Sequence, residues 1–218
     1  MVAGTNHTAQ RAVQGDRGTP DSTVLCSVTP IRTDAPAKVR ILATADRLFY
    51  EEGIRTVGID RLIGESNVTK ATFYKHWGSK DRLILQYLRG RHRAMQLQME
   101  ELEANLDHPA TAIRSLIVSM SSEIDRPGFR GCPFINASAE YSDPTSPARQ
   151  LVSAHREWYT DTLMELLRNA GHPLPGDAAD ELMLARDGAM VGGYAGDPVS
   201  AIAALRRTVE RVLRDAKA

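Results

Sequence analysis

The strongest constraint on the fold is a pair of short amphipathic segments, residues 59–65 and 69–77, which are separated by only three residues. Apolar residues recur at helical spacing in the first segment. In the second, Phe73 and Trp77 stand four residues apart, so both side chains point to one side of a helix. The remaining positions of that helix are mostly polar or basic. Two short helices joined by a tight turn predict a helix-turn-helix.

The rest of the chain after residue 35 also has helical periodicity, and no segment has the alternation of a convincing strand. Breakers at residues 126–128, 171–176 and 196–198 divide it into separate helices. No repeat of 20–50 residues is found. The pattern therefore predicts an all-α protein of about nine helices.

Residues 1–35 have no sustained apolar periodicity and are expected to form a disordered extension. In the alternative interpretation, Arg11, Arg17 and Arg32 belong to an arm that touches DNA phosphates or the minor groove. Residues 36–82 contain nine Lys or Arg and six Asp or Glu, a net charge of +3, whereas residues 83–218 contain 15 and 18, a net charge of −3. A mildly basic segment on a mildly acidic body favours a local contact with phosphates.

Over about residues 36–85 the chain resembles the DNA-binding domain of the TetR family of transcriptional regulators. The resemblance rests on a gap-free run, which reads Gly53-Ile54-x-x-Val57-Gly58-Ile59-x-x-Leu62, then Asn67-Val68-Thr69-Lys70-Ala71-Thr72-Phe73-Tyr74-x-His76-Trp77-x-Ser79-Lys80-x-x-Leu83. Four positions depart from the family pattern: Val57-Gly58 replaces Thr-Ser, Asn67 replaces the turn glycine, and Trp77 replaces Phe. Asn67 suits the turn because Asn accepts the left-handed conformation better than most residues.

The resemblance implies three parts: an extension (1–35), a helix-turn-helix DNA-binding domain (36–82) and a helical ligand-binding and dimerisation domain (83–218). It implies a bacterial, cytoplasmic, homodimeric regulator, most often a repressor, that binds a palindromic operator and is released by a small-molecule effector. No enzymatic activity and no cofactor are expected. Two alternatives stay open: a thiol or redox sensor that uses Cys132, and a small-molecule-binding protein with degenerate DNA binding.

Candidate DNA contacts lie on the second helix of the motif and around it. Short side chains near the start of a recognition helix let its backbone approach the bases, and lysine can donate to guanine. Tyr74, Lys75 and His76 are better placed for phosphates, and Lys80 resembles the family lysine that holds a phosphate. Thr56 is the candidate replacement for the hydroxyl missing at Gly58. The predicted DNA-binding residues are Thr56, Gly58, Thr69, Lys70, Ala71, Thr72, Tyr74, Lys75, His76 and Lys80.

Candidate effector contacts come from the middle helices, where Met and aromatic side chains are able to line a flexible apolar cavity. For any one of them, plain core packing is the competing interpretation. The effector is expected to be apolar or aromatic. The predicted residues are Met95, Met99, Met120, Phe129, Phe134, Asn136, Tyr141, His155, Trp158, Tyr159 and Met164.

Cys132 lies near a predicted helix start, where the dipole can lower the pKa of a thiol. An oxidant or electrophile sensor is one interpretation, and a buried inert cysteine is the favoured one. Only one other cysteine, Cys26, is present, so a structural disulfide is not expected and a reducing cytoplasm fits. No apolar run of 18 residues and no signal-peptide core are present, so no membrane partner is expected.

Small residues in the penultimate helix predict close approach of another helix, because each interior glycine costs about 1 kcal/mol against alanine. Together with the apolar stripe of the last helix, they predict a four-helix interface between two copies. Tight packing within one chain is the alternative. The predicted interface residues are Gly188, Ala189, Gly192, Gly193, Val209, Val212 and Leu213. The six histidines show no metal-binding spacing, and no catalytic constellation is found.

Overall fold

The computed structural model describes residues 35–105 and 108–216, which contain nine α-helices and no strand, so the predicted all-α fold is confirmed. The helices are α1 (Ala37–Glu52), α2 (Ile59–Glu65), α3 (Lys70–Trp77), α4 (Lys80–Asn105), α5 (Pro109–Ile124), α6 (Pro133–Glu140), α7 (Pro147–Asn169), α8 (Pro175–Ala195) and α9 (Pro198–Asp215). Residues 1–34, which include almost all of the predicted extension and its three arginines, lie outside the described residues. None of the described helices is both long and apolar enough to cross a membrane.

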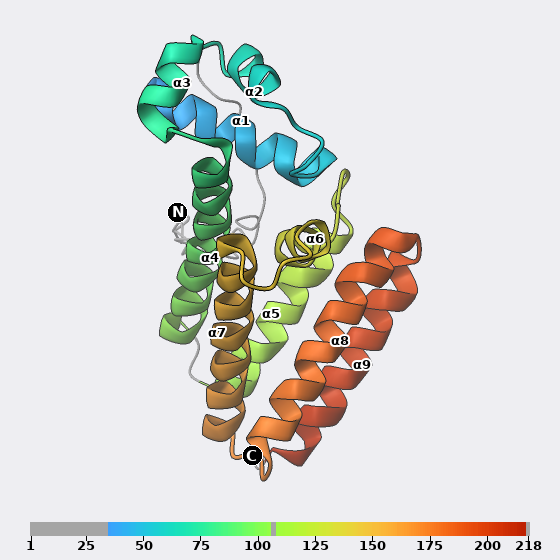
Figure 1. Cartoon of the computed structure of the whole chain (residues 1–218). Coiled ribbons are helices and arrows are strands. Elements are labelled where there is room, and N and C mark those ends of the chain that lie inside the picture. Colours follow the sequence, from blue (N-terminus) through green and yellow to red (C-terminus); the bar gives the residue numbers. More distant parts are fainter. Residues whose placement is uncertain (1–34, 106–107, 217–218) are drawn as a thin grey trace, which may run out of the picture.

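Helices α1–α3 form a small unit at one end of the molecule, and α4 leads from it into the remaining helices (Figure 1). Helix α7 packs on α4, α5, α6 and α8, and α8 in turn runs alongside α9 (Figure 1). The short helix α6 lies close beneath the α1–α3 unit (Figure 1). A continuous core extends through both parts of the chain.

Turn and cap residues fix where α3 and α4 begin. Asn67 has a positive φ of 50°, as predicted for the turn. The Thr69 hydroxyl oxygen accepts from the Thr72 N–H at 3.2 Å, which caps α3, and the Ser79 hydroxyl oxygen accepts from the Arg82 N–H at 3.2 Å, which caps α4. Each cap satisfies an N–H that has no partner within its own helix.

The inner side of α3 is held by Phe73 and Trp77, which are 0% and 7% exposed, as predicted. Both belong to the buried cluster that includes Ile41 and Leu48 of α1 and Leu62 of α2. Because one side of α3 is fixed against α1 and α2, its other side is presented to solvent.

Packing within the chain corrects most of the predicted dimer contacts. Val209, Val212 and Leu213 are 2%, 2% and 6% exposed, so helices of the same chain already cover them, and Ala189 is buried as well. A Cβ added at Gly193 would stand 2.5 Å from Ile124 Cγ2 of α5, and one added at Gly192 would stand 3.3 Å from Ala201 Cβ of α9. The small residues at these two positions are therefore explained by contacts inside one chain, and of the predicted set Gly188 remains exposed.

Candidate functional site

One face of α3 and part of the loop before α2 are exposed to solvent. Of the predicted DNA-binding residues, eight are exposed and Thr72 is half-buried. The Thr69 and Thr72 hydroxyls lie 2.9 Å apart and are hydrogen-bonded to each other. The exposed residues are Thr56, Gly58, Thr69, Lys70, Ala71, Tyr74, Lys75 and His76.

Lys80 is not part of this exposed surface. Its Nζ donates to the Ile54 carbonyl oxygen at 2.6 Å and lies 5.8 Å from the centre of the Phe49 ring. Burial lowers the pKa of Lys80, and the nearby carboxylates of Glu140 and Asp81 only partly oppose that effect. In this structure the amine therefore holds the link between α1 and α2 instead of taking the exposed position that the expected phosphate contact requires.

The turn between α2 and α3 is fastened to α1 by Arg40, which the sequence did not single out. Its Nε donates to the Ser66 carbonyl oxygen at 3.1 Å, and Nη2 donates to the Asn67 carbonyl oxygen at 3.0 Å. A single basic residue on α1 belongs to no recognisable sequence motif. Only its tertiary contacts reveal that Arg40 orients the helix-turn-helix.

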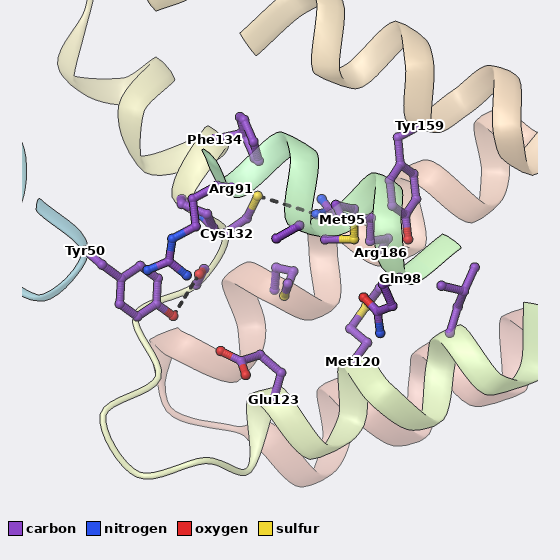
Figure 2. A pocket seen from close by; sticks show the side chains of 15 residues that line it. Tyr50, Arg91, Met95, Gln98, Met120, Glu123, Cys132, Phe134, Tyr159 and Arg186 are labelled. Atoms are coloured by element: carbon purple, nitrogen blue, oxygen red, sulfur yellow. Dashed lines mark hydrogen bonds between the residues drawn. The ribbon is translucent and has the colours of Figure 1, made fainter. Parts of the chain in front are cut away.

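A cavity of about 50 Å³ lies where α4, α5, α6 and α8 meet beneath α1 (Figure 2). Four predicted effector contacts line it: Met95, Met120, Phe134 and Tyr159. The other lining residues are Tyr50, Arg91, Ala94, Gln98, Leu116, Glu123, Gly131, Cys132, Pro133, Arg186 and Met190. Its accessible lining is mostly apolar, although the charged residues Arg91, Glu123 and Arg186 also reach it.

The other predicted effector contacts lie elsewhere. Met99 is buried in the core, and Trp158 and Met164 line a shallow surface groove on α7. The Asn136 side chain donates to the Arg130 carbonyl oxygen at 2.7 Å, and Phe129 packs near Gly193. Tyr141 is half-buried at the end of α6, outside the cavity lining. The structure thus separates these residues from the cavity, because helical spacing alone does not say which apolar side a cavity occupies.

His155 is buried beside the cavity and pairs with His92 of α4, the two Nδ1 atoms being 3.0 Å apart. Its ring stacks on Phe134 at 3.5 Å between centres. The pKa of His155 is lowered to about 3, first by burial and then by the charge of Arg186. The pair is formed by residues 63 positions apart, so no local spacing indicates it.

This burial gives a pH-dependent stability. His155 binds a proton in the unfolded chain below its ordinary pKa of 6.5 but resists it in the folded chain down to about 3. The contribution is therefore intact above pH 6.5 and is lost as pH falls towards 3, by about 2 kcal/mol at pH 5. We expect His155→Gln to reduce the loss of unfolding free energy between pH 7 and pH 5, measured by urea denaturation. An unchanged loss in the variant would contradict the assignment.

Cys132 is a free, buried thiol, which agrees with the favoured interpretation of a buried cysteine. Its sulfur accepts a hydrogen bond from Arg186 Nη2 at 3.5 Å. No group of three or more His, Cys, Asp or Glu side chains capable of holding a metal ion occurs in residues 35–105 and 108–216.

Three contacts tie the walls of the cavity to the α1–α3 unit. The Tyr50 hydroxyl of α1 donates to the Gly131 carbonyl oxygen at 3.1 Å (Figure 2). Arg91 of α4 donates Nε and Nη2 to the two carboxylate oxygens of Asp46 in α1, each at 2.7 Å. The third contact comes from Glu140, the last residue of α6, described next.

Glu140 accepts from two backbone N–H groups in the link after α1, those of Ile54 at 2.9 Å and Arg55 at 2.6 Å. Such charge-assisted bonds are roughly twice as strong as neutral ones. Helix α6 begins at the cavity and ends at this link, so it joins the two mechanically.

The sequence model of the family of bacterial regulatory proteins called the tetR family matches residues 41–87. The solved structure of a TetR-family transcriptional regulator from Streptomyces coelicolor is 43% identical, with a TM-score of 0.80, over 83% of this chain and 95% of that one. The transcriptional regulator LmrA of Bacillus subtilis is 25% identical over 138 residues, which are 62% of this chain and 73% of the relative. A TetR-family regulator from Agrobacterium tumefaciens, 22% identical, shares the fold with a TM-score of 0.72 over 80% and 96% of the two chains.

Proposed function

The chain belongs to the TetR family of DNA-binding transcriptional regulators, and from this premise we propose that it is a homodimeric repressor released by a small molecule. Residues 36–82 would bind the operator, and residues 83–218 would bind the effector and the second copy. The family consists of transcriptional regulators, which are generally not enzymes.

The exposed side of α3 is the observation that carries this proposal. Its first turn offers short side chains and Lys70 to the bases, since the major groove is roughly 12 Å wide and admits one helix. Tyr74, Lys75 and His76 are exposed towards its end and would contact phosphates, which fix the register without reading sequence.

A homodimer is supported by the outer side of α8. Leu184, Gly188 and Val191 recur at helical spacing, and the two large side chains are 72% and 51% exposed. An apolar stripe of this kind, with a glycine that lets another backbone approach, suits a second copy of the same helix. Two copies would place their α3 helices in successive half-sites, roughly 34–36 Å apart.

Release by an effector is supported by the contacts of Tyr50, Arg91 and Glu140. An effector shifts an equilibrium only if it binds one arrangement better than the other. A molecule that occupies the cavity displaces the walls to which Tyr50 and Arg91 belong, and both hold α1. The distance between the α3 helices of the two copies would then no longer match the separation of the operator half-sites.

The first test is selection of bound duplexes from a random pool by the full chain. We expect enrichment of a palindrome whose half-sites are one helical turn apart. Failure to enrich any sequence, with folded and dimeric protein, would reject the proposal.

The second test separates the two lysines. The logarithm of the operator-binding constant should fall linearly with the logarithm of the salt concentration. Lys75→Ala should make this fall less steep by roughly 0.9 for each phosphate that the lysine no longer neutralises, because fewer counterions are released. Lys80→Met should leave this slope close to that of the unmodified chain and should instead lower the unfolding temperature, because the Ile54 carbonyl loses its donor. Binding measured by gel shift between 50 and 200 mM salt checks both; an equal fall in slope for Lys80→Met would contradict the assignment.

A further inference from the structure

The group that decides what the cavity can bind is Arg186 of α8, which is only 3% exposed. Its Nη1 donates to Asp187 Oδ1 at 2.7 Å. Its Nη2 donates to the Cys132 sulfur at 3.5 Å (Figure 2). The guanidinium also lies 4.9 Å from the centre of the Tyr159 ring. Its Nε has no acceptor among the described residues. A buried donor without an acceptor is costly, so the site is incomplete as it stands.

The charges around Arg186 do not cancel. Asp187 also accepts from Arg156 Nη1 at 2.5 Å, so one carboxylate is shared by two guanidinium groups and the trio keeps one positive charge. The other two charged residues of the lining have ion pairs of their own: Arg91 with Asp46, and Glu123 with Arg126. The cavity is therefore electropositive on its Arg186 side and suited to a monoanion.

The rest of the lining sets the shape of that anion. Leu116 and three methionines, Met95, Met120 and Met190, give the cavity an apolar wall that can adjust its form. Gln98 Oε1 is a second buried atom without a partner among the described residues. Because amide oxygen and nitrogen exchange places by a half-turn, Gln98 can instead offer its NH₂ group to an anion.

The volume limits the length of the molecule. The cavity itself holds about 50 Å³, far below the 300–1,000 Å³ of a drug-sized site, although Arg186, Cys132 and Phe134 also face a neighbouring groove of about 790 Å³. At roughly 10–15 Å³ for each water-sized group, there is room for about three to five such groups, and the adjustable methionine wall can admit one more. We propose that the cavity binds a short aliphatic monocarboxylate, with its carboxylate on Arg186 and its alkyl chain among the methionines. This deepens the proposed function, on which it rests, because it names the chemical class of the effector.

The proposal is tested on the full chain by isothermal titration calorimetry with straight-chain acids from acetate to octanoate. Affinity should be greatest near propionate and butyrate and should fall for the longest acids. Butyramide, a neutral molecule of the same shape, should bind roughly 10- to 100-fold more weakly, since it cannot form charge-assisted hydrogen bonds. Equal binding of butyrate and butyramide would overturn the proposal, and so would equal binding of nitrate and butyrate, which would indicate a general anion site.

Arg186→Met should weaken butyrate binding by at least the same factor, whereas Arg114→Met, a matched change at an exposed ion pair with Glu210, should not. If Arg186→Met fails to fold, Arg186→Lys keeps the charge but loses the planar fork and should retain weaker binding. Unchanged butyrate affinity in a folded Arg186 variant would overturn the proposal.

Operator binding without any acid, measured beside these titrations, keeps the two proposals apart. Intact operator binding with no affinity for butyrate rejects only the effector class. Butyrate binding through Arg186 without operator binding supports this inference and rejects the repressor function.

Discussion

Phe73→Ala should lower the free energy of unfolding of the α1–α3 unit by about 3–5 kcal/mol and abolish operator binding. The side chain is fully buried between α3 and the helices α1 and α2, so truncation removes apolar packing and leaves a cavity. Thermal unfolding followed by circular dichroism measures the first effect, and a gel shift with the selected operator measures the second. Because α3 is held mainly through this side chain and Trp77, the effect extends over the whole helix.

The neighbouring residue provides the matched control. Tyr74 is 42% exposed, so Tyr74→Ala should change stability by less than about 1 kcal/mol and yet weaken operator binding. The two variants thus separate the packing of α3 against the domain from its contacts with the operator. A large stability loss in Tyr74→Ala, or a stable Phe73→Ala that still binds, would show that the faces of α3 have been assigned the wrong way round.

Gly193→Ala should lower the free energy of unfolding by about 1–3 kcal/mol, although alanine is the better helix former. The added methyl group would stand 2.5 Å from Ile124 Cγ2, and a β-branched side chain has little freedom to move aside. Urea denaturation of the full chain measures the effect. In an Ile124→Ala background, where that carbon is absent, the cost of Gly193→Ala should largely disappear.

Gly188→Ala is the control for this change. A Cβ added at Gly188 would meet no atom within 4 Å apart from the backbone of its own helix. Because alanine is the better helix former, the free energy of unfolding of the single chain should rise by up to about 1 kcal/mol. Any loss should appear only as weaker dimerisation in analytical ultracentrifugation, because Gly188 lies between Leu184 and Val191 on the proposed interface. A similar stability loss in both variants would contradict the intrachain explanation of Gly193.

Much of the α1–α3 unit could be predicted from the sequence because local signals there agree with one another. Thr69 and Ser79 are cap residues at the expected starts, Asn67 takes the left-handed turn, and Phe73 and Trp77 face inward. Each of these depends on interactions within a few residues of the chain, which spacing can report.

The role of Lys80 could not be predicted in the same way. Its position in the motif favours a phosphate contact, but its amine reaches the Ile54 carbonyl, 26 residues away. Part of the interface prediction was wrong for a related reason, whereas Gly188 stays on the proposed interface. Val209, Val212 and Leu213 form an apolar stripe, and a stripe does not say whether the helix that covers it belongs to the same chain.

The cavity shows the same division. Met95, Met120, Phe134 and Tyr159 could be suggested as its lining from residue type, while the charged members were missed. Arg186 stands on α8 among residues typical of a helix-packing surface, and nothing in its neighbours shows that it is buried beside Cys132, 54 positions away.

By itself, the sequence determined that this chain is all-helical, that it carries a helix-turn-helix, and which side of α3 faces solvent, because helical periodicity and capping are local properties. Only the tertiary structure decided which apolar stripes are covered within one chain, where the cavity lies, and that a buried guanidinium with an unpaired donor lines it. These depend on groups such as Arg186 and Cys132, 54 positions apart, and Tyr50 and Gly131, 81 positions apart, which only the packing of the whole bundle brings together.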